Sequence, residues 1–309
     1  MRKIAGFLFD LLLPGRAPSI WLYHYFVIWL FYYSQIRIIL LFRNRYKLPG
    51  ERERCISMCP DREADFSIAD NLQCVRSRIE AACKRAGRRP EDVTLIAVSK
   101  MKPFDDILEA SAAGAVDFGE NYVQELMQKI EQHRSLPAGH PVRWHMIGHL
   151  QKNKVKYLIG NTALIHSVDS VSLAEQIEKE AAKKDQVMRI LLEVNIAGEE
   201  SKWGFDPDSV CPAAQEIAAF PHVQALGLMT SAPFTEDPET NRGFFRGLNS
   251  LAQELAAKKL LTAADPDFPG PVLSMGMTGD FEVAVEEGAT MVRVGTAIFG
   301  NRYYAEGGN

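Results

Sequence analysis

The sequence predicts a single closed (β/α)8 barrel over residues 66–309, and two observations support it. About eight short runs of apolar or β-branched residues recur along the chain, which is the number of strands that a closed parallel barrel needs. Helical stretches alternate with these runs, as they do in repeated βα units. An open, doubly wound sheet would show the same alternation, but no G-x-G-x-x-G turn follows the first run, so we prefer the barrel.

The composition is that of a folded protein whose partners do not include nucleic acid. Hydrophobic residues make up 47% of the 309 residues and charged residues 24%, as in ordinary globular domains. The formal net charge of −4 leaves no basic surplus that could neutralise a phosphate backbone. Any anion that the protein binds must therefore be held by a local site.

Residues 1–57 form a hydrophobic and basic extension that differs from the rest of the chain. Residues 20–42 are long enough to cross a membrane as a helix, although Gln35 and Arg37 interrupt the run. If they do cross, the basic residues that follow outnumber those that precede, which keeps the barrel in the cytoplasm. The alternative is a mis-assigned start, with Met58 opening a complete soluble protein. Both explanations stay open, and both predict a cytoplasmic barrel.

The elements of the barrel follow one another in a regular order. A helix is expected first, over residues 68–86, because its apolar residues recur on one face. The eight expected strands are residues 93–99, 116–119, 143–147, 164–168, 189–196, 223–229, 272–275 and 291–294. The helices expected between them, several of which open with proline or with a capping Ser or Asp, are residues 103–113, 122–133, 172–184, 207–219 and 238–258.

Lys100 is the first candidate for chemistry, because it directly follows the first expected strand. Functional groups of such barrels project from the C-terminal ends of the strands. The strand is apolar on both faces, so a lysine at its rim can be desolvated enough to act as an amine nucleophile. Position alone is weak support, since a surface lysine whose stem packs along the barrel is the commoner explanation.

Two segments near the C-terminus predict an anion site. Residues 274–279 follow the seventh expected strand, and residues 293–296 end the eighth. Barrels of this kind often bind phosphate there, because small residues let backbone N–H groups approach the anion. The hydroxyls of Ser274 and Thr296 can donate to it. One such loop would be explained by a tight turn, but two loops on adjacent strands facing a lysine favour a phosphate site.

Arg293 and His145 are the remaining candidates. Arg293 lies two residues before Gly295 on the same side of its strand and can point into the same mouth, although a salt bridge at the rim is the alternative. His145 and His149 could suggest a metal pair, but H-x-x-x-H brings two imidazoles to one face only in a helix. This run reads as a strand that enters a loop, so we expect no metal. His145 is expected to stack near a cofactor or to fill the rim.

Five motifs, taken together, resemble those of one known family. Residues 144–154, WHMIGHLQKNK, resemble its hallmark stretch almost residue for residue. The A-V-S-K that ends at Lys100, the G-E-N that ends at Asn121, the S-M-G-M from Ser274 and the R-V-G-T from Arg293 resemble its other motifs in the same order. Residues 66–299 thereby resemble the pyridoxal phosphate homeostasis protein family, which consists of single-barrel relatives of alanine racemase.

The resemblance implies a TIM barrel like the N-terminal domain of alanine racemase, with pyridoxal 5'-phosphate as its cofactor. Lys100 would carry the cofactor as a covalent aldimine, and Arg293 would face the pyridine nitrogen. An arginine there cannot release its proton, so the nitrogen stays unprotonated and the cofactor is a weaker electron sink. The residues expected to bind the cofactor are Lys100, Asn121, His145, Ser274, Met275, Arg293, Gly295 and Thr296.

The resemblance also implies a role as a monomeric carrier or buffer of the cofactor. Such a protein would influence amino-acid and keto-acid balance and would hand the cofactor to dependent apoenzymes. Two alternatives are a weak amino-acid racemase and a membrane-tethered scaffold. A racemase needs a second base, and residues 301–309 are too few to form the separate domain that supplies one. Two features depart from the family pattern: the hydrophobic extension, and Gly279, where the family more often has a second acidic residue beside Asp280.

Overall fold

The structure is a computed structural model that describes residues 67–136, 141–199, 201–262, 265–268 and 270–300. The extension over residues 1–57, with its expected membrane helix at residues 20–42, lies outside the described residues. Within the described ranges, no helix is both long enough and apolar enough to cross a membrane.

Eight parallel strands close into a barrel in which each strand pairs with its neighbours in chain order. The barrel closes where Ala97 of the first strand pairs with Val294 of the last. The strands are β1 (Thr94–Val98), β2 (Asp117–Glu120), β3 (Arg143–Met146), β4 (Leu164–Val168), β5 (Met188–Glu193), β6 (Val223–Met229), β7 (Val272–Ser274) and β8 (Met291–Val294). The predicted barrel and its eight strands are thus confirmed.

Strand β5 ends well before the residue that its apolar pattern predicts, whereas the other strands differ from expectation by one residue at most at this end. The expected strand over residues 189–196 stops at Glu193, and the chain then turns at Asn195. The side chain of Asn195 donates to Glu199 O over 2.8 Å and accepts from Glu199 N at 3.2 Å. An asparagine side chain that bonds to nearby backbone groups in this way competes with strand pairing, and this competition is not visible in the hydrophobic pattern.

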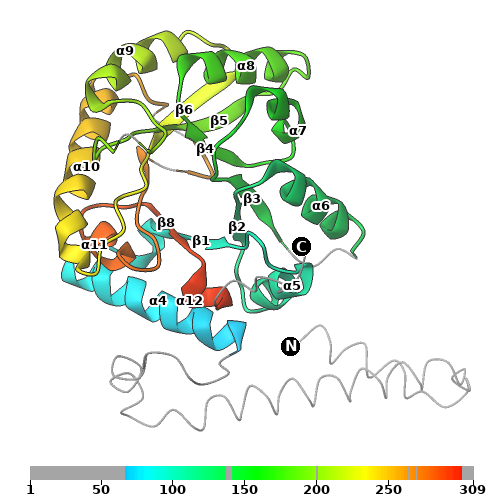
Figure 1. Cartoon of the computed structure of the whole chain (residues 1–309), viewed down its shortest axis with the longest axis vertical. Helices are drawn as coiled ribbons and strands as arrows, with labels where there is room; N and C mark the ends of the chain where they lie inside the picture. The colour runs from blue at the N-terminus through cyan, green and yellow to red at the C-terminus, as the bar shows by residue number, and fades with distance from the viewer. Residues whose placement is uncertain (1–66, 137–140, 200, 263–264, 269, 301–309) are drawn as a thin grey trace, which may run out of the picture. The chain divides into compact units, whose positions relative to one another are not determined.

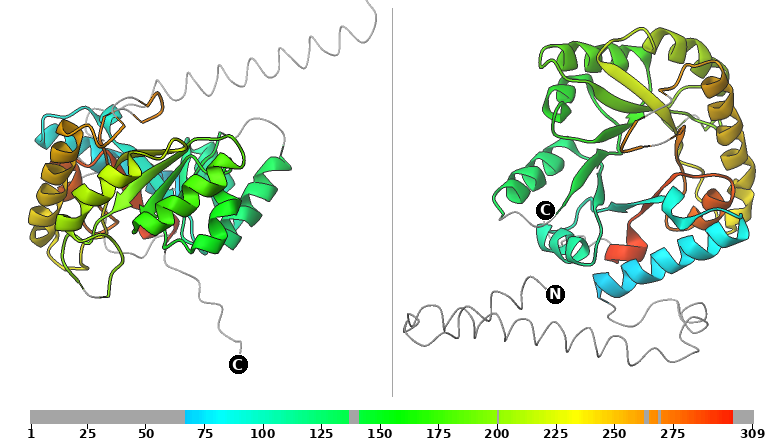
Figure 2. Two further views of the ribbon diagram at one scale, coloured as in Figure 1. Left: turned by 90° about the horizontal axis from the view of Figure 1, so that it is seen from above. Right: turned by 180° about the vertical axis from the view of Figure 1, so that it is seen from behind.

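Helices surround the strands on the outside, as views from the front (Figure 1) and from behind (Figure 2) show. The five helices expected between the strands are all present. The helices of the described residues are α4 (Ile68–Arg85), α5 (Phe104–Ala112), α6 (Val123–Arg134), α7 (Val155–Leu158), α8 (Val171–Ala182), α9 (Pro207–Ile217), α10 (Arg242–Ala257), α11 (Phe281–Glu286) and α12 (Thr296–Phe299). The expected helix at residues 238–258 begins as a 3-10 turn, Pro238–Asn241. The unexpected helices α7, α11 and α12 have four to six residues, too few for a periodic signal.

Helix α4 precedes the barrel and packs against the two C-terminal helices. It begins at Ser67, whose hydroxyl accepts from the backbone N–H of Asp70 at 3.2 Å and so satisfies one free donor of the first turn. Arg78 pairs with Glu282 of α11 at 2.6 Å. Figure 1 shows α4 lying beside α11 and α12. The first described helix therefore packs against the two helices that precede and follow β8.

Two apolar layers make up the core. A large layer fills the space between strands and helices. A small layer lies inside the barrel and consists of Ile96, Leu164, Leu191, Leu226, Met229, Phe268, Val272 and Met291. Successive strand residues point to opposite faces, so the residue two positions after an inner residue also points inward. On β5 and β8 these residues are Glu193 and Arg293, which follow Leu191 and Met291 at the C-terminal end of the barrel.

Candidate functional site

Lys100 lies in a tight turn directly after β1. The backbone N–H of Lys102 donates to Ser99 O over 3.1 Å and closes a four-residue turn in which Lys100 is the second residue. Met101, the third residue, has φ of 59°, as the third position of a type II turn requires. Ser99 is fully buried and Lys100 is half-buried. The predicted nucleophile therefore stands at the C-terminal rim of the barrel on a turn of defined shape.

The turn after β1 is a direct neighbour of the segment after β8. A Cβ atom added to Gly295 would lie 3.2 Å from Val98 O and 3.3 Å from Val98 Cβ, so only glycine lets these strand ends pack so closely without displacement. The ammonium of Lys102 donates to Phe299 O over 2.6 Å. The expected amine and one half of the expected phosphate site thus lie at the same rim, on adjacent strands.

The two expected anion loops also contact each other. The backbone N–H of Arg293 donates to Gly276 O over 3.0 Å, and the hydroxyl of Thr296 donates to Thr278 Oγ1 over 3.2 Å. Gly276 has φ of 89°, which an L side chain rarely adopts. Met275 packs its side chain into the outer apolar layer. The loops after β7 and β8 therefore form one continuous surface of small residues beside the Lys100 turn.

Arg293 is buried directly below this surface. Its guanidinium donates to Ser274 O at 2.7 Å, to Ser274 Oγ at 2.8 Å and to Thr230 O at 2.9 Å. All of these acceptors are uncharged, so the predicted alternative of a salt bridge at the rim is wrong. Burial lowers the pKa of Arg293 to about 10, although the charges of Glu193 and Asp280 oppose this. The residue therefore stays cationic at neutral pH.

The hydroxyl of Ser274 does not point freely toward the mouth. It accepts from Arg293, and it also lies 2.8 Å from Nδ1 of His166. Nε2 of His166 lies 3.0 Å from Nδ1 of His145, and Nε2 of His145 lies 2.9 Å from Asp117 Oδ1. The result is a buried chain of hydrogen bonds that runs from Arg293 through the interior of the barrel to the opposite strands.

This placement corrects the expectation for His145, which we expected at the rim. His145 lies within β3 and is fully buried, with its ring edge-on to His166 at a centroid distance of 5.2 Å and to Phe268 at 6.1 Å. Because it is an inward residue in the middle of the strand, it fills the interior and reaches Ser274 only through His166. The sequence motif could not show whether His145 lies at the rim of the barrel or in its interior.

Asp117 fixes the direction of this chain of hydrogen bonds at one end. Burial would raise the pKa of Asp117, but hydrogen bonds from His145 and Arg143 outweigh it and lower the pKa, so Asp117 is an anion that only accepts. Burial also lowers the pKa of His166 well below its usual value, so this ring is neutral. When Nδ1 of His145 accepts, each ring donates from Nε2 toward Asp117, and Ser274 must donate its hydroxyl hydrogen to His166.

His149 lies apart from this chain, at the rim. Its ring stacks on Trp203 at a centroid distance of 4.0 Å, and its Nδ1 lies 3.1 Å from Asp169 Oδ2. His145 and His149 thus bind different partners. Within the described part of the chain, no group of three or more His, Cys, Asp or Glu side chains is arranged to hold a metal ion.

Glu193 is a half-buried residue at the C-terminal end of β5, where its side chain points inward. Its Oε2 atom is buried and accepts or donates no hydrogen bond. Burial and, to a smaller extent, the charge of Asp169 raise the pKa of Glu193 to about 7, against the opposing charge of Arg293. The sequence shows Glu193 as an acidic residue at an inward position of an otherwise apolar strand, and this could have marked it as a candidate. The neighbouring charges of Asp169 and Arg293 could not be predicted from the sequence.

Asn121 lies immediately after the end of β2. A Cβ atom added to Gly148 would lie 2.5 Å from Asn121 O and 2.7 Å from Asn121 Cα. The backbone of the W-H-M-I-G motif therefore lies directly against Asn121. Of the predicted residues, the structure brings Lys100, Gly295 and Thr296 to one rim, and it places Ser274, Arg293 and His145 below that rim.

Comparison with known proteins identifies relatives of this barrel. A family model described as alanine racemase, N-terminal domain, matches residues 71–303. The chain is 44% identical over 239 residues to the pyridoxal phosphate homeostasis protein of Aquifex aeolicus, which covers 77% of this chain and 100% of that protein. It is 38% identical over 254 residues to the human protein of the same name, covering 79% of this chain and 90% of that protein.

A solved structure agrees with these relatives. PipY of Synechococcus elongatus PCC7942, determined with PLP bound, is similar with a TM-score of 0.64 and 34% sequence identity, and the similarity covers 76% of this chain and 100% of that one. The barrel, the motifs and the relatives thus agree: this chain belongs to the pyridoxal phosphate homeostasis protein family and has the fold of the alanine racemase N-terminal domain.

Proposed function

We propose that the protein binds pyridoxal 5'-phosphate as a Schiff base on Lys100 and acts as a carrier or buffer in intracellular homeostasis of this cofactor. Two contacts carry the proposal. Val98, at the end of β1, packs against Gly295, and Lys102 of the Lys100 turn donates to Phe299 O. An amine and a surface of small residues beside a buried cation match the aldehyde, the phosphate and the pyridine nitrogen of one molecule.

Each residue of the site would have a separate task. Lys100 would condense with the aldehyde, with loss of water. Gly295 and Thr296 would approach the phosphate, and Asn121 would line the opposite side. Met275 would contribute through its backbone, and Ser274 and His145 would act through Arg293, to which the hydrogen-bond chain connects them. When bound, the cofactor supplies an electrophilic aldehyde carbon, which is reactive toward amines and therefore benefits from being held.

A carrier role, rather than catalysis, is supported by Arg293. Because the guanidinium remains protonated, it cannot supply a proton to the pyridine nitrogen, and a neutral ring withdraws electrons weakly. The relatives are named homeostasis proteins. Our proposal extends to a monomeric barrel over residues 66–309 in the cytoplasm, which delivers the cofactor to dependent apoenzymes and is tethered to a membrane only if residues 20–42 form an anchor.

Borohydride trapping tests the proposal. Purified protein mixed with the cofactor should absorb visible light, and reduction should fix the mass of the cofactor to the peptide that contains Lys100. Lys100→Arg is the matched variant, because it retains the positive charge but cannot form the imine. The proposal fails if the wild-type protein remains colourless, or if reduction labels both proteins equally at other lysines.

Glu193 supports a second candidate, a weak amino-acid racemase. A half-buried carboxyl group with a pKa of about 7 is suited to accept and return a proton near neutral pH, and it lies on the inner side of the same barrel end. Exchange of the α-proton of added amino acids in deuterated water tests this activity. Exchange no faster than with free cofactor, or equally fast in Glu193→Gln, would exclude a role of this residue in such a reaction.

A further inference from the structure

The Lys100 turn rests on a buried ammonium group that the site described above does not include. Lys129 of α6 has a side chain that is only 5% exposed. Its Nζ lies 2.8 Å from Ser99 O, 2.7 Å from Glu120 Oε1 and 2.7 Å from Glu125 Oε1. An ammonium group has three N–H donors, so all of its donors are used, by acceptors at the end of β1, at the end of β2 and on α6.

The same cluster holds the backbone on both sides of Lys100. Lys129 binds the carbonyl of the residue before it, and Oε1 of Glu125 accepts the N–H of Met101, the residue after it, at 2.7 Å. The positive φ of Met101 is costly for a residue with a side chain and persists only where neighbouring contacts enforce it. The cluster formed by Lys129, Glu120 and Glu125 supplies these contacts.

The ammonium group of Lys129 offsets the negative charges of both Glu120 and Glu125. Burial raises the pKa of Glu120, whereas the charge of Lys129 opposes the rise. Glu120 also accepts the hydroxyl of Ser99 at 2.6 Å, and its second oxygen is buried without a hydrogen-bond partner. Without the ammonium, two carboxyl groups would face each other in a buried space. The cation therefore lets both acidic side chains keep their contacts with the turn.

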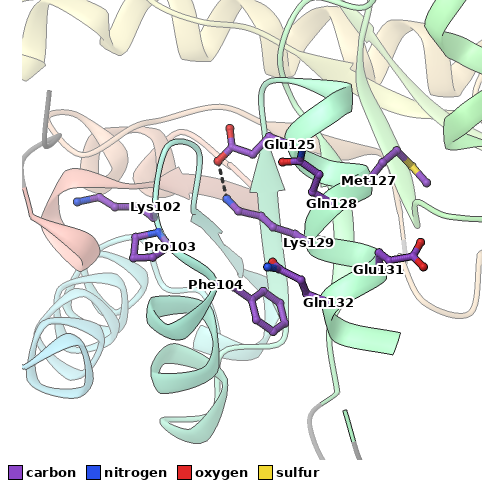
Figure 3. Close-up of a pocket in the computed structure, with 9 residues that line it drawn as sticks. All are labelled: Lys102, Pro103, Phe104, Glu125, Met127, Gln128, Lys129, Glu131 and Gln132. Carbon is purple, nitrogen blue, oxygen red and sulfur yellow. Dashed lines mark hydrogen bonds and ion pairs between the residues drawn. The ribbon is translucent and has the colours of Figure 1, made fainter. Parts of the chain in front are cut away.

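A cavity on the outer side of the barrel lies next to this cluster. It measures about 690 Å³ and is lined by the start of α5 and by α6, with Lys102, Phe104, Glu125 and Lys129 among its walls. Figure 3 shows Lys129 reaching from α6 toward Glu125 beside Lys102 and Pro103. Because the helices leave this space beside the turn, helix packing alone does not hold the turn there, and the polar contacts are needed.

We infer that Lys129 is a positioning residue for Lys100: together with Glu120 and Glu125, it fixes the turn from Ser99 to Lys102 and thereby the direction in which Lys100 presents its amine. The inference deepens the proposed function and rests on it as far as the cofactor is concerned. It does not require Lys129 to touch the cofactor. Whether Lys129 fixes the conformation of the turn from Ser99 to Lys102 can be measured in the protein without any ligand.

The test compares Lys129→Met with Gln128→Met in the full-length protein. Gln128 lines the same cavity from the same helix and makes none of the contacts with the turn described above. Hydrogen exchange of the cofactor-free protein should rise at least about tenfold at the Met101 amide in Lys129→Met, the loss expected for a charge-assisted contact, and remain unchanged in Gln128→Met. The rate of borohydride-trappable Schiff base formation should fall by a similar factor, also only in Lys129→Met.

Further variants keep the outcomes separable. If Lys129→Met does not fold, Glu125→Ala replaces it, because this half-buried acceptor can be removed while Lys129 retains Glu120, and the Met101 amide should again exchange faster. Unchanged exchange at Met101 and an unchanged rate of Schiff base formation in a folded variant would overturn the inference. A wild-type protein that takes up no cofactor would refute the proposed function instead, and the exchange measurement would still decide the role of Lys129.

Discussion

Nδ1 of His166 lies 2.8 Å from the hydroxyl oxygen of Ser274, although 108 residues separate the two in the sequence. β4 and β7, which carry them, are not neighbours in the barrel, so the bond crosses its interior. It couples the serine of the expected phosphate loop to the two buried imidazoles. The tautomers of these rings therefore decide whether the Ser274 hydroxyl donates inward or is available to a ligand.

The first prediction concerns the tautomer of His166. We expect His145 to donate to Asp117 through Nε2 and to accept through Nδ1, so the neutral His166 ring should carry its proton on Nε2 and leave Nδ1 as the acceptor from Ser274. Nitrogen chemical shifts of histidine-labelled, cofactor-free protein at neutral pH report this directly. His166 should also remain neutral on acidification below the usual range for histidine, because burial lowers its pKa. A proton on Nδ1 at neutral pH would contradict the assigned direction.

The second prediction concerns Asp117, at the other end of the chain. Asp117→Asn should lower the free energy of unfolding at pH 7 by roughly 2–4 kcal/mol, because Asn presents an NH2 group to one of its two donors, the buried His145 or the half-buried Arg143. Asp117 has a lowered pKa in the folded state, so its contribution is complete above the unfolded pKa of roughly 3.9 and is lost as the pH falls through the folded value. The difference in unfolding free energy between wild type and Asp117→Asn, measured by urea denaturation, should therefore become smaller in acid than at pH 7.

Asp92→Asn is the matched control for Asp117→Asn. Asp92 pairs with Arg89 at 2.6 Å on the surface, where solvent screens the pair. Loss of this ion pair should therefore change the unfolding free energy little, both at pH 7 and in acid. Equal effects of the two substitutions would show that the interior chain contributes no more than a surface pair.

The fold could be predicted from the sequence because its strands are short, apolar and separated by helices of sufficient length. The run at residues 93–99 and the helix at 122–133 are signals of this kind. What could not be predicted depends on contacts between distant segments. The end of β5 at Glu193 follows from the side-chain hydrogen bonds of Asn195, and α11 and α12 are too short to show periodicity.

The site was predictable only where its residues follow strands. Lys100 and Gly295 lie just beyond the ends of β1 and β8, and the position of these ends in a barrel is known in advance. The depth of a side chain is not known in advance, which is why His145 lies lower than expected. Lys129 shows the same limit, since a lysine in the middle of an amphipathic helix looks exposed until the acceptors from β1 and β2 are in place.

The third prediction concerns Glu193. Its pKa of about 7 in the folded state exceeds the unfolded value of roughly 4.3. Between these values the unfolded chain releases the proton more readily, so the raised pKa destabilises the folded protein increasingly as the pH rises, and the full effect is present above pH 7. Glu193→Gln should thus gain stability relative to wild type on going from pH 5 to pH 8, by on the order of 3 kcal/mol.

Urea denaturation of both cofactor-free proteins at the two pH values measures this difference. Glu216→Gln, an exposed position on α9, is the control and should differ from wild type by the same small amount at both pH values. A Glu193→Gln variant whose stability relative to wild type does not change between pH 5 and pH 8 would show that the buried oxygen is already satisfied, contrary to its position in the structure.

The fourth prediction concerns Gly148, in the hallmark motif. Gly148→Ala would force a methyl group to within 2.5 Å of Asn121 O and 2.7 Å of its Cα, and a backbone neighbour cannot rotate away. We expect a loss of about 1–3 kcal/mol of unfolding free energy, as for an overpacked core, together with weaker cofactor binding because Asn121 is displaced. Gly279→Ala is the control, since nothing lies within 4 Å of its added Cβ. Both quantities are measured, by urea denaturation and by titration of the visible absorbance. If Gly148→Ala lost stability but bound the cofactor as tightly as Gly279→Ala, the motif glycine would serve packing alone, and Asn121 would have no part in the site.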